Sequence, residues 1–227
     1  MPHLDRDGDV AVLTLGDDEN RFSPDRVRAW NELLDEVEHA EGPRALVTRA
    51  EGKFWSNGLD LGWFAEHSEE ADAFLAEVHR LLARVLVLPL PTVAAVTGHA
   101  FAAGAMLAVA HDAAVMRTGR GYWCLPEVEI GLPFSPGMQA LLLDRLPRRT
   151  ATEAMTTGRR YAAAEAQAAG IVDVTAAEDD VVATAVARAA ALAHTAGPTL
   201  GAIKAGLHAG AADVLRTAPV RFPRGEG

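Results

Sequence analysis

Glu127 is the residue whose sequence surroundings are best suited to proton exchange. It stands in the run Leu125-Pro126-Glu127-Val128-Glu129-Ile130-Gly131-Leu132-Pro133, which is otherwise largely apolar. Apolar neighbours desolvate a carboxylate, and desolvation raises its pKa toward neutrality, where it is an effective base. Most glutamates in loops are simply solvated, and the period-two alternation places Glu129 on the same face as a competing candidate. The run alone leaves both glutamates, and a purely structural role, open.

Two segments of small residues could bring the backbone close to a ligand. Residues 56–61 (SNGLDL) follow an expected strand and precede an expected helix, where free N–H groups bind anions or polarised carbonyls. Residues 98–106 (GHAFAAGAM) join a strand to a buried helix and leave room for another molecule. Spacing alone fits equally well a tight turn capped by Asp60 and close helix–strand packing.

Residue counts and spacings exclude several other kinds of site. Cys124 is the only cysteine, so an internal disulfide and a cysteine-built zinc site are excluded. Among the eight histidines, neither His99 nor His111 has a second His or Cys at metal-ligand spacing, and we expect no metal. The sequence contains no Gly-x-Ser-x-Gly nucleophile motif and no Gly-x-x-x-x-Gly-Lys phosphate loop. Cys124 has no evident His partner and is interpreted as a buried thiol.

Composition limits the partners. The 227 residues include 21 Lys+Arg against 31 Asp+Glu, a net charge of −10 without a basic block, which disfavours nucleic acid. The uncharged stretch 85–110 is long enough to span a bilayer, but Pro89, Pro91, Gly98 and Gly104 interrupt it, so we interpret it as buried core. No secretory signal or lipid or peroxisomal address is apparent, and a cytoplasmic protein without a membrane partner is expected.

The elements that would position these segments alternate along the chain. A hairpin is expected up to residue 15, with further strands at 45–48, 92–96, 113–116 and 171–174. Expected helices follow the Ser23-Pro24 cap and cover about 69–87, 104–111, 179–194 and 199–208. This alternation predicts an α/β core with helical additions toward the C-terminus.

Taken in order, these segments resemble the crotonase superfamily, the enoyl-CoA hydratase/isomerase family. The resemblance runs from about Val10 to Leu207 and is most specific in residues 53–61 (KFWSNGLDL), 91–104 (PTVAAVTGHAFAAG), 126–133 (PEVEIGLP) and 166–173 (AQAAGIVD). Within the family the chain is most similar to the Δ3,Δ2-enoyl-CoA isomerases of the plant peroxisomal type. The resemblance implies a spiral of repeated ββα units over residues 1–195, a short C-terminal helical segment and tail over 196–227, and a homotrimer or dimer of trimers.

The resemblance also implies an oxyanion hole for the carbonyl of an acyl-CoA thioester. By motif position its two backbone N–H groups are those of Leu59 and Ala103. The surrounding substrate-binding positions are Asn57, Gly58, Asp60, Leu61 and Gly104. Coenzyme A enters as part of the substrate, so no cofactor is expected.

Two glutamates act in the family's hydratases, and this sequence keeps only one of them. The second position is Glu127, whereas the first holds Met106, which cannot hold or activate water. A single carboxylate is sufficient to move a proton from C2 to C4 of a 3-enoyl thioester. The pattern therefore favours an isomerase of fatty-acid metabolism that turns 3-enoyl-CoA into trans-2-enoyl-CoA.

Alternatives remain at several positions. A hydratase, or another crotonase activity, would need Glu129 or a bound water in place of the missing glutamate, and a non-catalytic acyl-CoA-binding protein would have no use for Glu127. Arg21 or Lys53 could meet the coenzyme A phosphates, or either could be solvated surface charge. The aromatic residues Trp63, Phe64 and Phe74 fit the wall of an acyl pocket and also fit the core.

Overall fold

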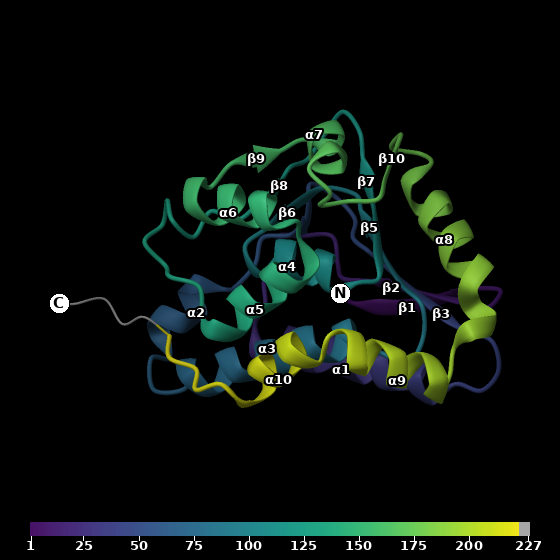
Figure 1. Cartoon of the computed structure of the whole chain (residues 1–227), viewed down its shortest axis with the longest axis horizontal. Coiled ribbons are helices and arrows are strands. Elements are labelled where there is room, and N and C mark those ends of the chain that lie inside the picture. The colour runs from purple at the N-terminus through teal and green to yellow at the C-terminus, as the bar shows by residue number, and fades with distance from the viewer. Residues whose placement is uncertain (223–227) are drawn as a thin grey trace.

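The structure, a computed structural model, describes residues 1–222 and contains two β-sheets flanked by helices (Figure 1). The predicted tail lies partly beyond this range, since residues 223–227 fall outside the described part. The large sheet has the order β1 (His3–Asp7), β2 (Val10–Thr14), β3 (Ala45–Arg49), β5 (Thr92–Val96), β7 (Ala113–Arg117) and β10 (Val174–Ala176). Only the β1–β2 hairpin is antiparallel.

The small sheet consists of very short strands. Its order is β4 (Phe54–Ser56), β6 (His99–Phe101), β8 (Trp123–Cys124) and β9 (Arg160–Tyr161), and only the β8–β9 pair is antiparallel. Strands this short were not resolved by the apolar pattern of the sequence, because two or three residues show no periodicity.

The two sheets are joined by repeated ββα units, which confirms the predicted spiral. In each unit the first strand enters the large sheet and the second enters the small sheet, and a helix follows. The units are β3–β4 with α2 (Leu61–Glu66) and α3 (Ala71–Leu86), β5–β6 with α4 (Ala103–Ala110), and β7–β8 with α5 (Pro136–Arg145).

The remaining helices cover the sheets. They are α1 (Pro24–His39), α6 (Arg148–Thr157), α7 (Ala163–Ala168), α8 (Val181–Leu192), α9 (Pro198–Leu207) and α10 (Ala209–Thr217), with a 3-10 turn at Ala193–Thr195. Helix α8 packs on one face of the large sheet (Figure 1). Its Val181, Ala185 and Ala189 pack there against valines of the sheet. The opposite face of the large sheet packs against the main core. Helix α10 packs on α3 and α5 and contributes Leu215 to this core.

One sequence expectation is corrected here, and the interpretation of the uncharged stretch 85–110 as buried core is confirmed. The strand expected at 171–174 is β10, which begins only at Val174, because Asp173 ends the preceding turn and accepts a hydrogen bond from Ala114 N–H at 2.8 Å. The uncharged stretch 85–110 is divided among the end of α3, β5, β6 and α4. Within residues 1–222, no helix is both long and apolar enough to cross a bilayer.

Candidate functional site

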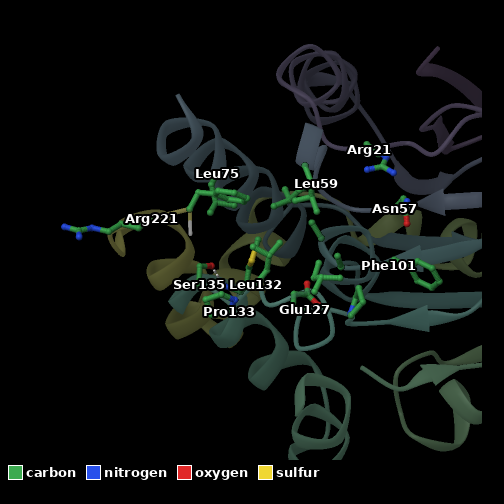
Figure 2. A pocket seen from close by; sticks show the side chains of 17 residues that line it. Arg21, Asn57, Leu59, Leu75, Phe101, Glu127, Leu132, Pro133, Ser135 and Arg221 are labelled. Carbon is green, nitrogen blue, oxygen red and sulfur yellow. Dashed lines mark hydrogen bonds between the residues drawn. The ribbon is translucent and has the colours of Figure 1, made fainter. Parts of the chain in front are cut away.

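A cavity of about 260 Å³ lies where the small sheet meets α3, α4 and α5 (Figure 2). The residues that line it come from segments far apart in the sequence: Arg21, Asn57, Leu59, Leu61, Leu75, Phe101, Ala102, Ala103, Pro126, Glu127, Ile130, Leu132, Pro133, Ser135, Met138, Arg221 and Phe222. Figure 2 shows Asn57, Arg21 and Phe101 toward one end of the cavity and Ser135, Leu75 and Arg221 toward the other, with Glu127 and Leu59 in the middle.

The N–H of Leu59 is free to face this cavity. Leu59 forms a parallel bridge with Phe22, in which Phe22 N–H donates to Gly58 O at 2.8 Å and Phe22 O accepts from Asp60 N–H at 3.1 Å. This pattern uses the groups on either side of Leu59 and turns its own N–H to the opposite side. No described residue accepts a hydrogen bond from it.

The N–H of Ala103 is the second free donor. Ala103 begins α4, where the first N–H groups of a helix have no partner within the helix. The preceding Ala102 has φ 51° and ψ −125° and offers no side-chain cap, so among residues 1–222 the Ala103 N–H also finds no acceptor. Such a conformation is unfavourable for alanine and is held by the hydrogen bond from Ala102 N–H to Cys124 O at 3.0 Å.

Gly58 brings the two donors together. Its φ is +80°, and a Cβ placed on it would lie 2.8 Å from Ala102 Cβ and 3.1 Å from Ala103 N. Only a residue without a side chain permits this approach. The Gly58–Leu59 peptide therefore lies directly beside the start of α4, and Leu59 and Ala103, whose N–H groups are free, line one cavity.

Glu127 supplies the carboxylate of the cavity. Its side chain is only 7% exposed, and its Oε2 is buried without a partner among the described residues. Burial raises the pKa of Glu127 to about 7, although a backbone hydrogen bond opposes the shift. It is the only acidic residue that lines the cavity within residues 1–222, so the arrangement combines one proton carrier near neutral pKa with two fixed N–H donors.

The expected alternation of Glu127 and Glu129 on one face is wrong. Residues 127–130 form a turn rather than a strand, with Glu129 N–H donating to Pro126 O at 2.9 Å and Leu132 N–H to Glu127 O at 3.0 Å. The turn buries Glu127 and leaves Glu129 exposed beside Gly158. Glu129 is thereby removed from the cavity.

The other residues expected at the site divide into two groups. Asn57 and Leu61 line the cavity, as Leu59 and Ala103 do. Asp60 instead caps α2, its Oδ1 accepting from Trp63 N–H at 3.3 Å. Gly104 lies against Ser56, where an added Cβ would be 2.5 Å from Ser56 O, so its role is close packing.

Met106 lies in the main core rather than in the wall of the cavity. Its side chain is fully buried in α4, and it is absent from the residues that line the cavity. It places no polar group near Glu127. Met106 therefore supplies neither a carboxylate nor any other group that could activate water in the cavity.

Of the two candidate cations for the coenzyme A phosphates, only Arg21 lines the cavity within residues 1–222. Arg21 lines the cavity near Asn57, and its Nε contacts Glu19 Oε2 at 2.6 Å. Lys53 lies over the Phe54 ring, with its Nζ 5.1 Å from the ring centroid, and is not part of the cavity wall.

The far end of the cavity is the part that sequence reasoning missed. It is formed by Leu75, Leu132, Ser135, Met138 and Phe222, of which only Leu132 lies in one of the motifs identified in the sequence. The aromatic residues expected as candidates for the acyl pocket are core instead, since Phe64 and Phe74 are almost fully buried and neither they nor Trp63 line the cavity. Phe222 stacks on Phe64 with ring centroids 4.3 Å apart, which holds this lining residue against the core.

Cys124 and His111 have structural partners. Burial raises the pKa of Cys124 to about 11, and its thiol donates to Gly158 O at 3.2 Å, as expected of an inert buried thiol. His111 is fully buried, donating from Nδ1 to Leu107 O and accepting from the Thr48 hydroxyl, both at 2.8 Å. In the part of the chain that the structure describes, no group of three or more His, Cys, Asp or Glu residues is arranged to hold a metal ion.

Comparison with known proteins adds a relationship to this geometry. The family model described as enoyl-CoA hydratase/isomerase matches residues 5–219. The chain is 38% identical over 183 residues to enoyl-CoA delta isomerase 3 of Arabidopsis thaliana, covering 76% of each chain. Its fold is similar to an apo enoyl-CoA isomerase of Mycobacterium tuberculosis (TM-score 0.87, 28% identity, 95% and 94% of the two chains). It is also similar to an enoyl-CoA hydratase of Mycobacterium marinum (TM-score 0.86, 26% identity, 95% and 94%).

Proposed function

Since the chain belongs to the enoyl-CoA hydratase/isomerase family, we propose that it is an isomerase that converts 3-enoyl-CoA into trans-2-enoyl-CoA. One observation carries this proposal: among residues 1–222, Glu127 is the single carboxylate that lines a cavity also lined by Leu59 and Ala103, whose N–H groups are free. An isomerase requires one proton carrier and a site for the enolate oxygen. The cavity offers this set of groups.

The two N–H groups act on the thioester carbonyl. Placed between Leu59 and Ala103, the carbonyl oxygen receives two hydrogen bonds that strengthen as negative charge develops on it. Because the backbone donors are already oriented, no reorganisation is required as the enolate forms. Loss of one such donor costs about 3–4 kcal/mol of transition-state stabilisation in other enzymes, so the pair accounts for a large part of the rate.

Glu127 moves the proton. Its carboxylate removes a proton from C2, and the electron pair of that C–H bond passes into a dienolate whose charge rests on the thioester oxygen. The protonated Glu127 then returns the proton to C4, while the double bond moves from C3–C4 to C2–C3. A pKa of about 7 suits both steps, because the group is ionised often enough to accept and acidic enough to donate.

Hydration is the competing reaction, and the cavity supports it less well. Adding water across a double bond requires a group that activates water in addition to the acid/base at the acyl chain. Met106 occupies the place of the family's first glutamate, and Glu129 lies exposed outside the cavity. A bound water held by other groups is the remaining route to a hydratase. A non-catalytic acyl-CoA-binding protein would not benefit from a desolvated carboxylate in this position.

The test is to give purified protein a 3-enoyl-CoA and, separately, a 2-enoyl-CoA, and to follow the ultraviolet absorbance of the conjugated thioester. An isomerase produces a rise with the first substrate and no loss with the second. Loss of the conjugated signal with the second substrate would mean hydration. No change with either substrate over several chain lengths would favour the binding protein.

Assembly, location and cofactor requirement follow as further proposals. We propose a homotrimer or a dimer of trimers, since the family resemblance implies it, and sedimentation of a monomer at micromolar concentration would contradict it. A cytoplasmic location is likewise proposed and is tested by cell fractionation. The proton shuttle needs only residues of the chain and the acyl-CoA substrate, and we propose that activity survives dialysis against a metal chelator.

A further inference from the structure

A buried polar pair lies at the apolar end of the cavity. Ser135 lines the cavity, and its Oγ is 2.8 Å from Nε2 of His79, which is completely buried in α3. Figure 2 shows Ser135 toward the end where Leu75 and Arg221 lie, away from Asn57 and Phe101, with the Arg221 side chain extended away from the cavity. The isomerisation derived above uses neither Ser135 nor His79.

The hydrogen-bond partners of His79 determine its tautomer. Burial lowers the pKa of His79 to about 4, so the imidazole is neutral and carries one N–H. Its Nδ1 is buried without a partner within residues 1–222 and faces Gly137, on which an added Cβ would lie 3.0 Å away. A buried N–H without an acceptor is more costly than a buried unpaired acceptor, and the proton therefore belongs on Nε2.

This tautomer leaves the Ser135 proton free. The Oγ atom accepts from His79 Nε2–H and from Met138 N–H at 3.3 Å, since Ser135 is also the N-cap of α5. Both lone pairs of the hydroxyl are then occupied, and its O–H has no acceptor among the described residues. The hydroxyl is a donor held in place by two other donors, beside a cavity.

The surroundings make this donor selective. The other side chains at this end, Leu75, Leu132, Met138 and Phe222, offer no oxygen or nitrogen acceptor, and the Met138 thioether is only a weak acceptor. Water can satisfy the hydroxyl in the empty cavity, but an acyl chain displaces that water. A hydrocarbon chain leaves the donor unpaired, whereas a chain with an oxygen atom at this point restores the hydrogen bond.

We propose that Ser135, positioned by His79, is a specificity-determining residue that selects acyl-CoA substrates bearing an oxygen acceptor, a ketone or hydroxyl group, near the end of the acyl chain. This inference rests on the proposed function only in taking an acyl-CoA as the ligand. The oxygen is remote from the thioester, so the selection acts on the substrate's tail and leaves the double-bond shift unchanged. His79 acts through Ser135 and is a positioning residue.

Calorimetric binding of saturated acyl-CoA pairs tests the proposal without any turnover. Each pair has the same chain length, and one member carries a ketone oxygen on the carbon next to the chain end. At the chain length that fits, the wild-type protein is expected to bind the oxygenated member at least about tenfold more tightly. Equal affinity at every chain length would overturn the proposal. Failure of the isomerase assay with preference retained would reject the proposed function alone.

Ser135→Gly removes the hydroxyl while keeping a residue that caps helices acceptably. The matched control is Ser23→Gly, because Ser23 also caps a helix, accepts from Arg26 N–H at 3.4 Å and precedes a proline, but does not line the cavity. We expect Ser135→Gly to abolish the preference and Ser23→Gly to retain it. Retention of the preference in Ser135→Gly would contradict the assignment.

His79 is tested by the same ratio of affinities, which a general loss of stability would not change. His79→Leu removes the donor to Ser135 Oγ and is expected to reduce the preference, while His79→Gln, which retains an N–H donor, is expected to restore it. If His79→Leu keeps the full preference, the positioning role is wrong. Where His79→Leu does not fold, His79→Gln and Ser135→Thr, which both keep a held hydroxyl, must still show the preference.

Discussion

At the scale of single residues, Glu127 combines chemical usefulness with a cost to stability. A carboxylate whose Oε2 is buried without a partner is ionised only with difficulty, which is why its pKa rises to about 7. The same desolvation that makes it a base near neutral pH destabilises the folded chain once the group ionises. Both consequences can be measured.

The pH dependence of activity follows from this pKa. In the proposed mechanism the free enzyme must hold Glu127 as the carboxylate, so kcat/KM should rise with pH through about 7 and then level off. A stopped-flow or steady-state profile with a 3-enoyl-CoA measures this limb. An ascending limb near the usual glutamate value of 4.5 would show that Glu127 is not desolvated in solution.

The pH dependence of stability has the opposite sign. Between 4.5 and about 7 the folded state binds the Glu127 proton more tightly than the unfolded state, so this group makes stability fall as pH rises through that window. Glu127→Gln removes this effect. Above pH 7 its free energy of unfolding should exceed that of the wild type by at most about 3 kcal/mol, and below pH 4.5 this difference should be absent. Denaturant unfolding of both proteins at the two extremes measures the difference, and a constant difference would contradict the linkage.

At the scale of elements, the site depends on the parallel pairing of β4 with β6 in the small sheet. Gly58 follows β4, and Ala102 and Ala103 follow β6, so the parallel pairing of these strands brings both N–H donors to the same edge. Ala102, with φ 51° and ψ −125°, offers no side-chain cap at the start of α4, which leaves the N–H of the lining residue Ala103 without an acceptor among residues 1–222.

Gly58→Ala should separate the two donors. The new Cβ meets Ala102 Cβ at 2.8 Å and Phe101 O at 3.0 Å, and backbone cannot yield as a flexible side chain would. We expect kcat to fall by about 10²-fold or more, the effect of losing one oxyanion donor. Gly119→Ala is the matched control, because φ there is +75° with no atom within 4 Å of the new Cβ, so it carries the strain without the collision. Similar losses in both variants would contradict the role given to Gly58.

The elements also show what a sequence can predict. Strands β2, β3, β5 and β7 were predictable, since each contains a run of three or four apolar residues bounded by turns or polar positions. The small sheet was not, because pairing with neighbours, rather than periodicity, makes strands of two or three residues. The prediction that Glu127 and Glu129 share one face was wrong for a related reason. A turn stabilised by local hydrogen bonds can have the same alternating residue pattern as a strand.

At the scale of the whole molecule, the cavity is closed by parts that only the folded chain brings together. Glu127, Leu59 and Ala103 were accessible from their motifs, but Leu75 on α3, Met138 on α5 and Phe222 meet through packing alone. Phe222 reaches its place because its N–H donates to Asp72 Oδ1 at 2.7 Å and its ring stacks on Phe64. In the proposed function, tertiary contacts rather than any local segment would therefore determine which acyl group fits the cavity.

Phe222→Ala should enlarge the acyl end of the cavity. The substitution removes part of the cavity wall together with the stacking on Phe64. The ratio of kcat/KM for longer or branched acyl chains to kcat/KM for short chains should therefore rise by about tenfold. The catalytic groups are untouched, and kcat with the best substrate should change little. A chain-length series assayed on both proteins measures the shift, with Leu207→Ala, at an exposed side chain of α9, as the control. An unchanged chain-length profile would remove Phe222 from the acyl wall.

The central claim is that Glu127 is the sole proton carrier of this site, and Glu127→Gln tests it most directly. Turnover of a 3-enoyl-CoA and affinity for a saturated acyl-CoA are measured on the same preparation, with the wild type beside it. The account predicts a fall in kcat of about 10²–10⁴-fold, as for loss of a general acid–base, with the dissociation constant almost unchanged, since glutamine keeps the shape and the N–H donors remain. A Glu127→Gln protein that retains wild-type turnover would contradict the account.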